Sequence, residues 1–392
     1  MSENKNVPEL RFPGFDGEWL VSKLSQACSM RAGKFVQASE IHNEKESGMY
    51  PCFGGNGLRG YTRSKTHEGI YPLIGRQGAL CGNVQLANGQ FHATEHAVVV
   101  EASEQNDALW LYYLLDTLKL NRYATGQAQP GLSVDVIEKI KSYFPSLSEQ
   151  QKIADFLSAV DKRIERLTEK YRLLTEYKKG VMQQIFSQQI RFKDDKGNEY
   201  PKWEEKKLGE VLVFARNGLS IEQVSKETEY PVTRIETISD GRVNLQKVGY
   251  ISPDKDISSY KLLPGDILFS NINSVSHIGK VAFVPDDINL FHGMNLLCLR
   301  PDKNVVLPAF IFISMTRVDV RNYFKRVCNQ AVNQASINQT DLKKTTLRFP
   351  CLEEQEKIVD FLTVIDNKID QAWSKIEQTK AFKKGLLQRL FV

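Results

Sequence analysis

The chain has 392 residues, more than one hydrophobic core usually supports, so two or more domains are expected. Its 41% hydrophobic and 25% charged residues are typical of a globular protein and argue against disordered, collagen-like and membrane-embedded classes. The net charge of +5 permits nucleic-acid binding without demanding it.

The cysteines and the N-terminus indicate a reduced, cytoplasmic protein. The six cysteines lie far apart without a Cys-x-x-Cys pair, so neither a zinc site nor a disulfide framework is predicted. The first twelve residues lack the apolar core of a signal peptide, and no stretch approaches the roughly 20 apolar residues that span a bilayer.

The first body of the chain combines strand and helix patterns with two deceptive motifs. HAVVVEA (96–102) reads as a strand, and the run from Trp110, WLYYLLDTLKL, reads as a helix. The glycines at 54–60 satisfy GxGxxG and resemble an S-adenosylmethionine loop, but the flanking sequences favour a turn. His92 and His96 would share one face of a strand without a third ligand, so no metal site is predicted.

A long helix follows the first body. Apolar residues recur from Ile153 to Leu174 at alternating spacings of four and three, the pattern of a coiled-coil seam. Ser148 resembles the start of a capping box, with Pro145 just before it. About 40 residues at 1.5 Å per residue give a rod of roughly 60 Å.

The second body repeats the mixed pattern. Segments 265–270, 279–285 and 295–301 read as strands, and the run from Pro308 to Arg326 reads as a helix. An α+β fold is predicted for both bodies.

A 42-residue repeat organises the whole chain, because residues 350–391 match residues 145–186 without a gap at an offset of 205. The identical pairs include Glu149/Glu354, Gln150/Gln355, Lys152/Lys357, Asp155/Asp360, Phe156/Phe361, Asp161/Asp366 and the KKG triplets at Lys178 and Lys383. The similarity extends upstream to Gln129/Gln334, Leu132/Ile337, Ile137/Leu342 and Phe144/Phe349, and RFPGFDGEW and RFKDDKGNEYPKW open the two halves.

The two helices each carry a narrow apolar seam that needs a partner. The simplest arrangement is an antiparallel coiled coil of the two copies with an internal pseudo-two-fold axis. The alternative is that each helix docks only on its own body.

The chain lacks the N/D-P-P-Y/F motif of adenine amino-methylation and the GxxxxGK[ST] motif of nucleotide binding. We therefore expect no catalysis by this chain alone, no catalytic residues, no metal and no cofactor.

The repeated P-x-L-x-EQ-x-KI-x-DFL and KKG-x-x-Q-x-x-F patterns closely resemble those of the specificity (HsdS) subunits of Type I restriction-modification systems. GDILFS at 265–270 fits the same family, and residues 71–75 are a looser equivalent. The resemblance implies a first target-recognition domain at 1–145, a central conserved coiled-coil helix at 146–190, a second target-recognition domain at 191–350 and a C-terminal conserved helix at 351–392.

The resemblance also implies a function and partners. Each target-recognition domain would read half of a bipartite, asymmetric site in double-stranded DNA. The paired helices would set the gap and dock two methylase (HsdM) subunits, and restriction (HsdR) subunits would join through the complex for N6-adenine methylation or cleavage. If the rods act as a ruler, inserting four residues into one would lengthen it by about 6 Å.

The candidate DNA-binding residues are polar or basic and lie on turns that could reach base edges or phosphates, although any one could be an ordinary solvated loop residue. They are Arg59, Arg63, Lys65, Arg76, Gln77, Gln127, Gln129, Asn271, Asn273, Ser274, His277, Lys280, Asn333 and Gln334.

Two other functions stay open: a scaffold whose coiled coil binds proteins while its bodies bind no DNA, and an enzyme with an unrecognised site. DNA affinity of the assembled complex distinguishes the first from the specificity subunit, and methylation by the isolated chain would indicate the second.

Overall fold

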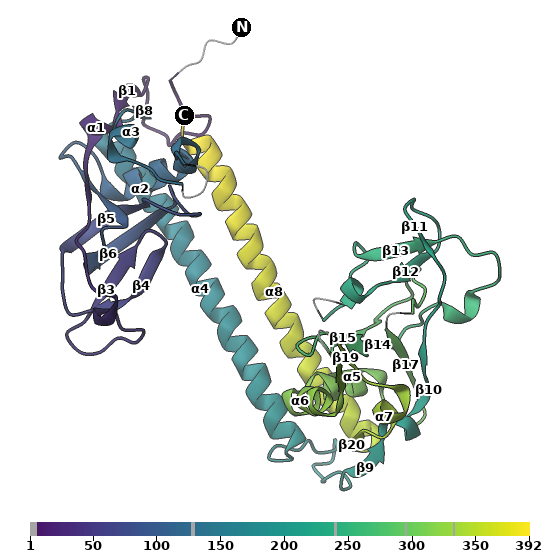
Figure 1. The fold of residues 1–392 in the computed structure, drawn as a ribbon. Helices are drawn as coiled ribbons and strands as arrows, with labels where there is room; N and C mark the ends of the chain where they lie inside the picture. Colours follow the sequence, from purple (N-terminus) through teal and green to yellow (C-terminus); the bar gives the residue numbers. More distant parts are fainter. Residues whose placement is uncertain (1–5, 127–129, 239–240, 295, 332–333) are drawn as a thin grey trace. The chain divides into compact units, whose positions relative to one another are not determined.

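The computed structural model describes residues 6–126, 130–238, 241–294, 296–331 and 334–392. The chain forms two compact units: unit 1 comprises Met1–Tyr171 and Gln371–Val392, and unit 2 comprises Arg172–Asp370. Each unit therefore contains one α+β body together with part of each long helix (Figure 1).

The body of unit 1 is built on a six-stranded sheet in the order β2-β7-β5-β6-β3-β4. Its neighbouring strands are antiparallel except for the parallel pair β3 and β6. The strands are β2 (Cys28–Ala32), β3 (Tyr50–Gly54), β4 (Gly57–Thr62), β5 (His67–Gly75), β6 (Val84–Ala93) and β7 (Ala97–Ala102).

Both faces of this sheet are covered, which explains the nearly continuous apolar run in β7. Val98 and Val100 face a core that includes Trp110 of α2 (Ala108–Thr117), whereas Val99 faces a second cluster with Leu73 and Phe91. Successive side chains of a strand point to opposite faces, so every position of such a strand is apolar.

The body of unit 2 repeats the central part of this architecture. Its four-stranded antiparallel sheet has the order β10-β17-β14-β16, matching β2-β7-β5-β6 of unit 1. The strands are β10 (Leu212–Asn217), β14 (Ile267–Phe269), β16 (Val281–Phe283) and β17 (Leu297–Pro301). The prediction of two tandem α+β bodies is confirmed.

Smaller elements complete the two bodies. In unit 1 they are β1 (Leu20–Lys23), α1 (Leu24–Ala27), η1 (Ala38–Glu40), η2 (Leu120–Tyr123), α3 (Val134–Glu138) and β8 (Lys141–Phe144). In unit 2 the strands are β9 (Glu204–Lys207), β11 (Gln223–Val224), β12 (Pro231–Thr233), β13 (Val248–Ile251), β15 (Ile272–Asn273), β18 (Asn329–Ala331), β19 (Gln334–Ser336) and β20 (Thr346–Phe349). Its helices are η3 (Leu208–Glu210), η4 (Ile235–Ile238), η5 (Ser258–Tyr260), α5 (Pro308–Thr316), α6 (Val318–Val327) and α7 (Gln339–Lys343).

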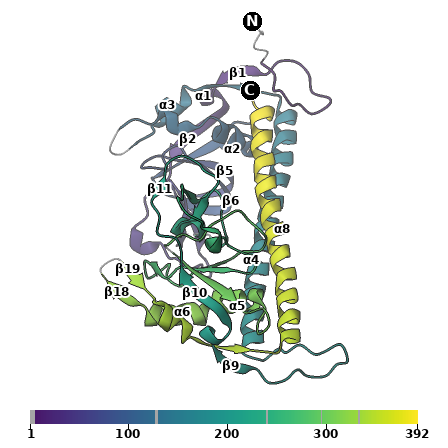
Figure 2. The same ribbon diagram turned by 90° about the vertical axis from the view of Figure 1, so that its right-hand side faces the viewer.

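The long helices are α4 (Leu147–Phe186) and α8 (Leu352–Leu390), and within each unit their segments lie side by side (Figures 1 and 2). In unit 1 Asp161 pairs with Lys383 and the ring of Tyr171 lies 5.4 Å from that of Trp373. Ten residues forward along α4 thus correspond to ten residues back along α8, so the segments are antiparallel. In unit 2 the two helices are joined by Lys178 and Asp366.

In each unit the predicted seam of one helix shares a core with apolar residues near the C-terminal end of the other helix, which the predicted seam did not include. In unit 1 the α4 residues Ile153, Leu157 and Val160 share a core with Leu386 and Leu390 of α8. In unit 2 the roles are exchanged: Val181 and Ile185 of α4 share a core with Ile358, Leu362 and Ile365 of α8. The prediction of an antiparallel coiled-coil pair is confirmed.

Three local predictions are wrong. The helix expected from Pro308 to Arg326 is two helices, because Arg317 has an extended backbone (ψ 144°) that separates α5 from α6. The cap of α4 is Ser146, whose Oγ accepts a hydrogen bond from the backbone N–H of Glu149, whereas Ser148 lies inside the first turn. His96 lies beyond the end of β6 and shares no strand with His92.

The glycine-rich run at 54–60 forms the turn of the β3–β4 hairpin, as expected. Neither end of this turn leads into a helix, so the arrangement that a dinucleotide or S-adenosylmethionine loop requires is not formed there.

Candidate nucleic-acid interface

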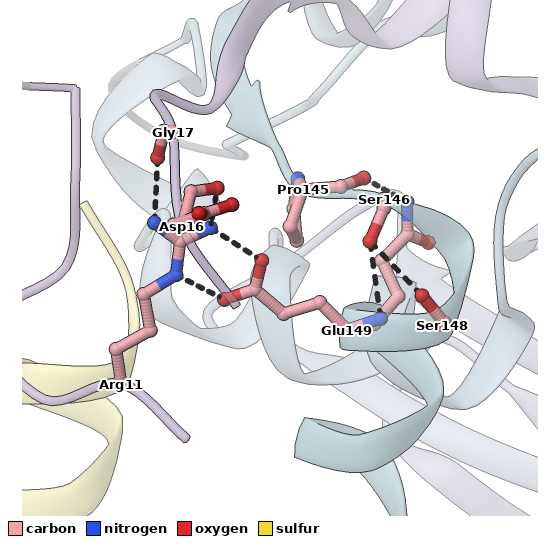
Figure 3. Close-up of polar contacts among 8 residues, drawn as sticks. Arg11, Asp16, Gly17, Pro145, Ser146, Ser148 and Glu149 are labelled. Atoms are coloured by element: carbon pink, nitrogen blue, oxygen red, sulfur yellow. Dashed lines mark hydrogen bonds and ion pairs between the residues drawn. The ribbon is translucent and has the colours of Figure 1, made fainter. Parts of the chain in front are cut away.

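The first turn of α4 holds the segment that leads into the body of unit 1 (Figure 3). Arg11 donates from Nε and Nη2 to the two carboxylate oxygens of Glu149, both at 2.8 Å, and it also donates to the backbone carbonyls of Asp16 and Gly17. The Glu149 side chain is 2% exposed, so its carboxylate depends on this bidentate pair. The hydrogen bond to Glu149 raises the pKa of Arg11.

The first turn of α8 repeats this clamp in unit 2. Arg191 donates to both oxygens of Glu354 at 3.1 and 2.7 Å and to the carbonyls of Tyr200 and Pro201. The indole N–H of Trp203 adds a third hydrogen bond to Glu354 at 3.1 Å. The arginine that opens each half is therefore a partner of the repeated glutamate, and in unit 2 the tryptophan is a second partner.

The repeated glutamines fix the helix starts to the bodies. Gln150 accepts a hydrogen bond from the N–H of Asp107, the N-cap of α2, and donates to the carbonyl of Pro145. Gln355 makes the matching bonds to the N–H of Leu307, the N-cap of α5, and to Pro350. These hydrogen bonds, here called the glutamine seat, join each body to the start of its long helix.

In unit 1 the body and both helices meet at Asp161. The carboxylate accepts hydrogen bonds from the Tyr113 hydroxyl of α2 at 2.8 Å and from the Lys383 ammonium of α8. Burial, and then the hydrogen bond to Asp161, raise the pKa of Tyr113, which keeps its hydroxyl a donor. The repeated segments therefore act as a frame that carries the loops of each body.

The predicted reading residues of unit 1 fall into two groups. Arg59 lies on β4, and Arg63 and Lys65 follow it in exposed ion pairs with Glu46 and Glu68. A separate group, Arg76 and Gln77, follows β5 and is tied to the segment at 131–132, since Leu132 donates to the Arg76 carbonyl and Gln77 bridges to Gly131. The predicted residues Gln127 and Gln129 lie outside the described residues.

The β3–β4 turn brings the two groups of unit 1 close together. The Arg59 side chain crosses Gly54, where a Cβ atom would lie 2.5 Å from the Arg59 Cδ. The backbone of Gly55 lies against that of Gly75 and Arg76. The glycine-rich turn at 54–60 therefore brings Arg59 and Arg76 to the same edge of the sheet.

Five of the predicted residues of unit 2 lie on the connection between β14 and β16. Ser274 and His277 are exposed and joined by a hydrogen bond of 3.0 Å, and Asn273 and Lys280 are half-buried. Asn271 is 7% exposed, and its side-chain oxygen has no hydrogen-bond partner among the described residues. Asn271 is therefore less accessible to DNA than we expected.

The structure joins this connection to a second predicted segment. Strand β15 pairs with β19, so that Asn273 lies opposite Ala335, beside Gln334, whose backbone belongs to β19. Asn333 lies outside the described residues.

Sequence reasoning missed the loop that follows β2. This loop contains Lys34 and the ring of Phe35, which is 72% exposed. The only sequence signal is a basic and an aromatic residue directly after Gly33, which is too short to be distinctive.

The described residues contain no cluster of three or more histidine, cysteine, aspartate or glutamate side chains arranged to hold a metal ion. In the same part of the chain, no helix combines the length and apolar character needed to cross a membrane.

Comparison with known proteins gives the family. The model of the Type I restriction modification DNA specificity domain matches residues 16–175 and 200–379. The chain therefore belongs to this family and carries two copies of its domain. The match covers both bodies and most of both long helices.

Curated relatives agree with the family model. The chain is 43% identical over 210 residues to a putative type I restriction enzyme MjaX specificity subunit of Methanocaldococcus jannaschii, covering 53% of this chain and 49% of that protein. It is 47% identical over 151 residues to the EcoprrI specificity subunit of Escherichia coli, covering 38% of each. The chain thus spans half or less of the length of these two relatives.

A solved structure shares the fold along nearly the whole chain. The S subunit of a Type-I restriction-modification system from M. genitalium matches with a TM-score of 0.69 at 17% identity, covering 98% of this chain and 99% of that one.

Proposed function

We propose that this chain is the specificity subunit of a Type I restriction-modification complex and reads a bipartite, asymmetric site in double-stranded DNA. Residues 1–145 and 191–350 would be its two target-recognition domains. The chain would position methylase (HsdM) and restriction (HsdR) subunits for N6-adenine methylation or cleavage, and would itself perform no chemistry.

The observation that carries this proposal is the repeated frame with unlike loops. Each body has the same order of its four matching strands, an arginine–glutamate clamp of its own and a glutamine seat of its own. The loops that the frame presents differ in sequence and in structure: an arginine-rich hairpin edge in unit 1, and a connection rich in asparagine and serine in unit 2.

This combination suits two readers of different half-sites. Arginine favours guanine, and asparagine favours adenine, at major-groove edges. Two unlike sets of loops on equivalent frames would therefore select two unlike half-sites, which gives an asymmetric site.

The test is a base-resolution map of N6-methyladenine in host DNA with the gene intact and deleted. We expect a gapped, two-part motif that is methylated on both strands and disappears on deletion. To exclude a silent system, the chain is also assembled with its methylase and assayed on DNA containing the motif. A methylome that stays unchanged while the assembled complex methylates no preferred sequence would refute the proposal.

A further inference from the structure

The loop after β2 in unit 1 is fixed to the sheet at its start. Gly33 donates its N–H to the carbonyl of Ala97 at 2.9 Å, and Lys34 donates to Ala93 at 2.8 Å. A Cβ atom at Gly33 would lie 2.3 Å from the Ala93 oxygen, so the close approach requires glycine. The backbone just before Phe35 is therefore held to the sheet by two hydrogen bonds.

The same loop is fixed again at its far end. His42 and Tyr61 exchange two backbone hydrogen bonds of 2.8 Å, which attaches the loop to β4. Between the two attachments lies a pocket of about 660 Å³, lined by the loop and by residues 62–66. The loop that lines the pocket is thus attached by backbone hydrogen bonds at both of its ends.

The floor of this pocket is polar. His92 is 3% exposed, and its Nε2 lies 3.0 Å from the Lys34 carbonyl, which can only accept, so Nε2 carries the hydrogen. In the neutral ring Nδ1 then accepts from the Ser64 hydroxyl at 2.9 Å. Ser64 is thereby oriented with its free lone pairs away from the ring, the Thr62 hydroxyl lies 3.5 Å from it, and Thr66 also lines the pocket.

The mouth of the pocket is cationic with one aromatic ring. Lys34, Arg63 and Lys65 line it, together with Phe35. The acidic partners of Arg63 and Lys65 are exposed, and such pairs contribute little and exchange readily. Lys34 forms no ion pair with any described residue. Glu40, the acidic lining residue, is engaged with the N–H of Gln37 in its own loop.

Unit 2 contains the same backbone arrangement with different side chains beside it. Gly218 follows β10 as Gly33 follows β2, and its Cβ atom would lie 2.2 Å from the carbonyl of His292. There the next residue, Leu219, is buried in an apolar cluster with Val232 and Phe291. A common frame is thus filled with apolar side chains in one body and is open, polar and cationic in the other.

We propose that the pocket of unit 1 binds one nucleotide of the target DNA. This inference rests on the function proposed above and adds a contact point to it. The phosphate lies at the mouth between Lys34, Arg63 and Lys65, where ammonium and guanidinium groups donate to its oxygens. The attached base leaves the duplex stack, which frees its π-face for stacking on the ring of Phe35.

The experiment compares variants in the complex assembled with the methylase. Lys34→Ala is expected to weaken binding to target duplex severalfold and to lower the magnitude of the salt slope by about one. Phe35→Ala is expected to weaken binding about tenfold. For a second measurement, 2-aminopurine is placed in turn at each position of the half-site read by unit 1. The unmodified complex should raise its fluorescence at one position, and Phe35→Ala should abolish this rise.

Two controls keep the result interpretable. Lys45→Ala removes an exposed lysine that follows the same loop without lining the pocket, and it should leave the salt slope nearly unchanged. Phe35→Trp keeps an aromatic face and should retain binding. Phe35 is exposed, so its variants should fold, which a thermal melt of each complex verifies.

The outcomes separate the pocket from the function. If the unmodified complex binds its target specifically while Lys34→Ala and Phe35→Ala both bind within twofold of it, the pocket proposal is overturned and the specificity function stands. If only Lys34→Ala weakens binding, the stacking role of Phe35 is overturned. If the unmodified complex shows no preference for any sequence, the proposed function itself fails.

Discussion

The clamps in the two units predict that two substitutions that look equivalent lower stability by unequal amounts. Arg11→Leu leaves the Glu149 carboxylate, 2% exposed, without any hydrogen-bond donor found among the described residues. Breaking a buried pair in this way costs about 3–5 kcal/mol. We therefore expect a strong and local loss of stability in unit 1.

The matching change in unit 2, Arg191→Leu, should cost less. Glu354 keeps the hydrogen bond from the Trp203 indole at 3.1 Å, whereas the indole N–H of Trp19 in unit 1 has no partner among the described residues. A hydrogen bond to a charged group contributes about 1.5–3 kcal/mol. The difference between the two arginine variants should therefore be about 1.5–3 kcal/mol.

Hydrogen exchange followed by mass spectrometry measures each unit separately. Peptides from α2 report on unit 1, and peptides from α5 report on unit 2. A loss of 3 kcal/mol lowers protection by about two orders of magnitude, because each 1.4 kcal/mol is a factor of ten. The double variant Arg11→Leu/Glu149→Leu should recover most of the loss, since no charge is then left buried. Equal losses in the two units, or a double variant as unstable as Arg11→Leu, would refute this reasoning.

Four further predictions follow from the frame and its loops. Tyr113→Phe should lower the stability of unit 1 by about 1–2 kcal/mol in urea denaturation, because a hydrogen bond to a carboxylate is lost without a cavity; an unchanged midpoint contradicts it. Asp161→Lys should destabilise unit 1 by placing two ammonium groups together, and adding Lys383→Asp should restore at least half of the loss. Arg76→Ala should weaken target binding about tenfold and relax sequence preference, and unchanged affinity and preference would show that this loop does not read DNA. Inserting four residues into both α4 and α8, which keeps their pairing, should lengthen each by about 6 Å and widen the recognised gap by nearly two base pairs; a methylome with the original gap rejects the ruler.

The frame was predictable from sequence because its signals are local and repeated. The seam spacing from Ile153 onward fixed both helices, and the 205-residue offset identified the residues that the frame uses, including Glu149 and Gln150. Their partners were not predictable, since Arg11 lies 138 residues from Glu149 and only the folded chain brings them together.

The structure of the loops could not be predicted from local sequence patterns. Asn271 reads as an ordinary polar loop residue, yet it is buried because the neighbouring β15 pairs with β19 more than 60 residues later. The break at Arg317 carries no proline or glycine, so helical periodicity continues through it in the sequence. The pocket near Phe35 depends on two backbone attachments that no short motif encodes.

The make-up of unit 1 has a consequence for its biosynthesis. Leu386, Leu390 and Phe391 belong to the same core as Trp110 and Leu157, so the first body to leave the ribosome lacks part of its interior. The intervening segment from 172 to 370 must be translated first, and at about 5–20 residues per second this takes on the order of 10–40 seconds. During this interval the part of this core that α8 covers in the folded chain is exposed to solvent. The first domain in the sequence is thus the last to complete its fold.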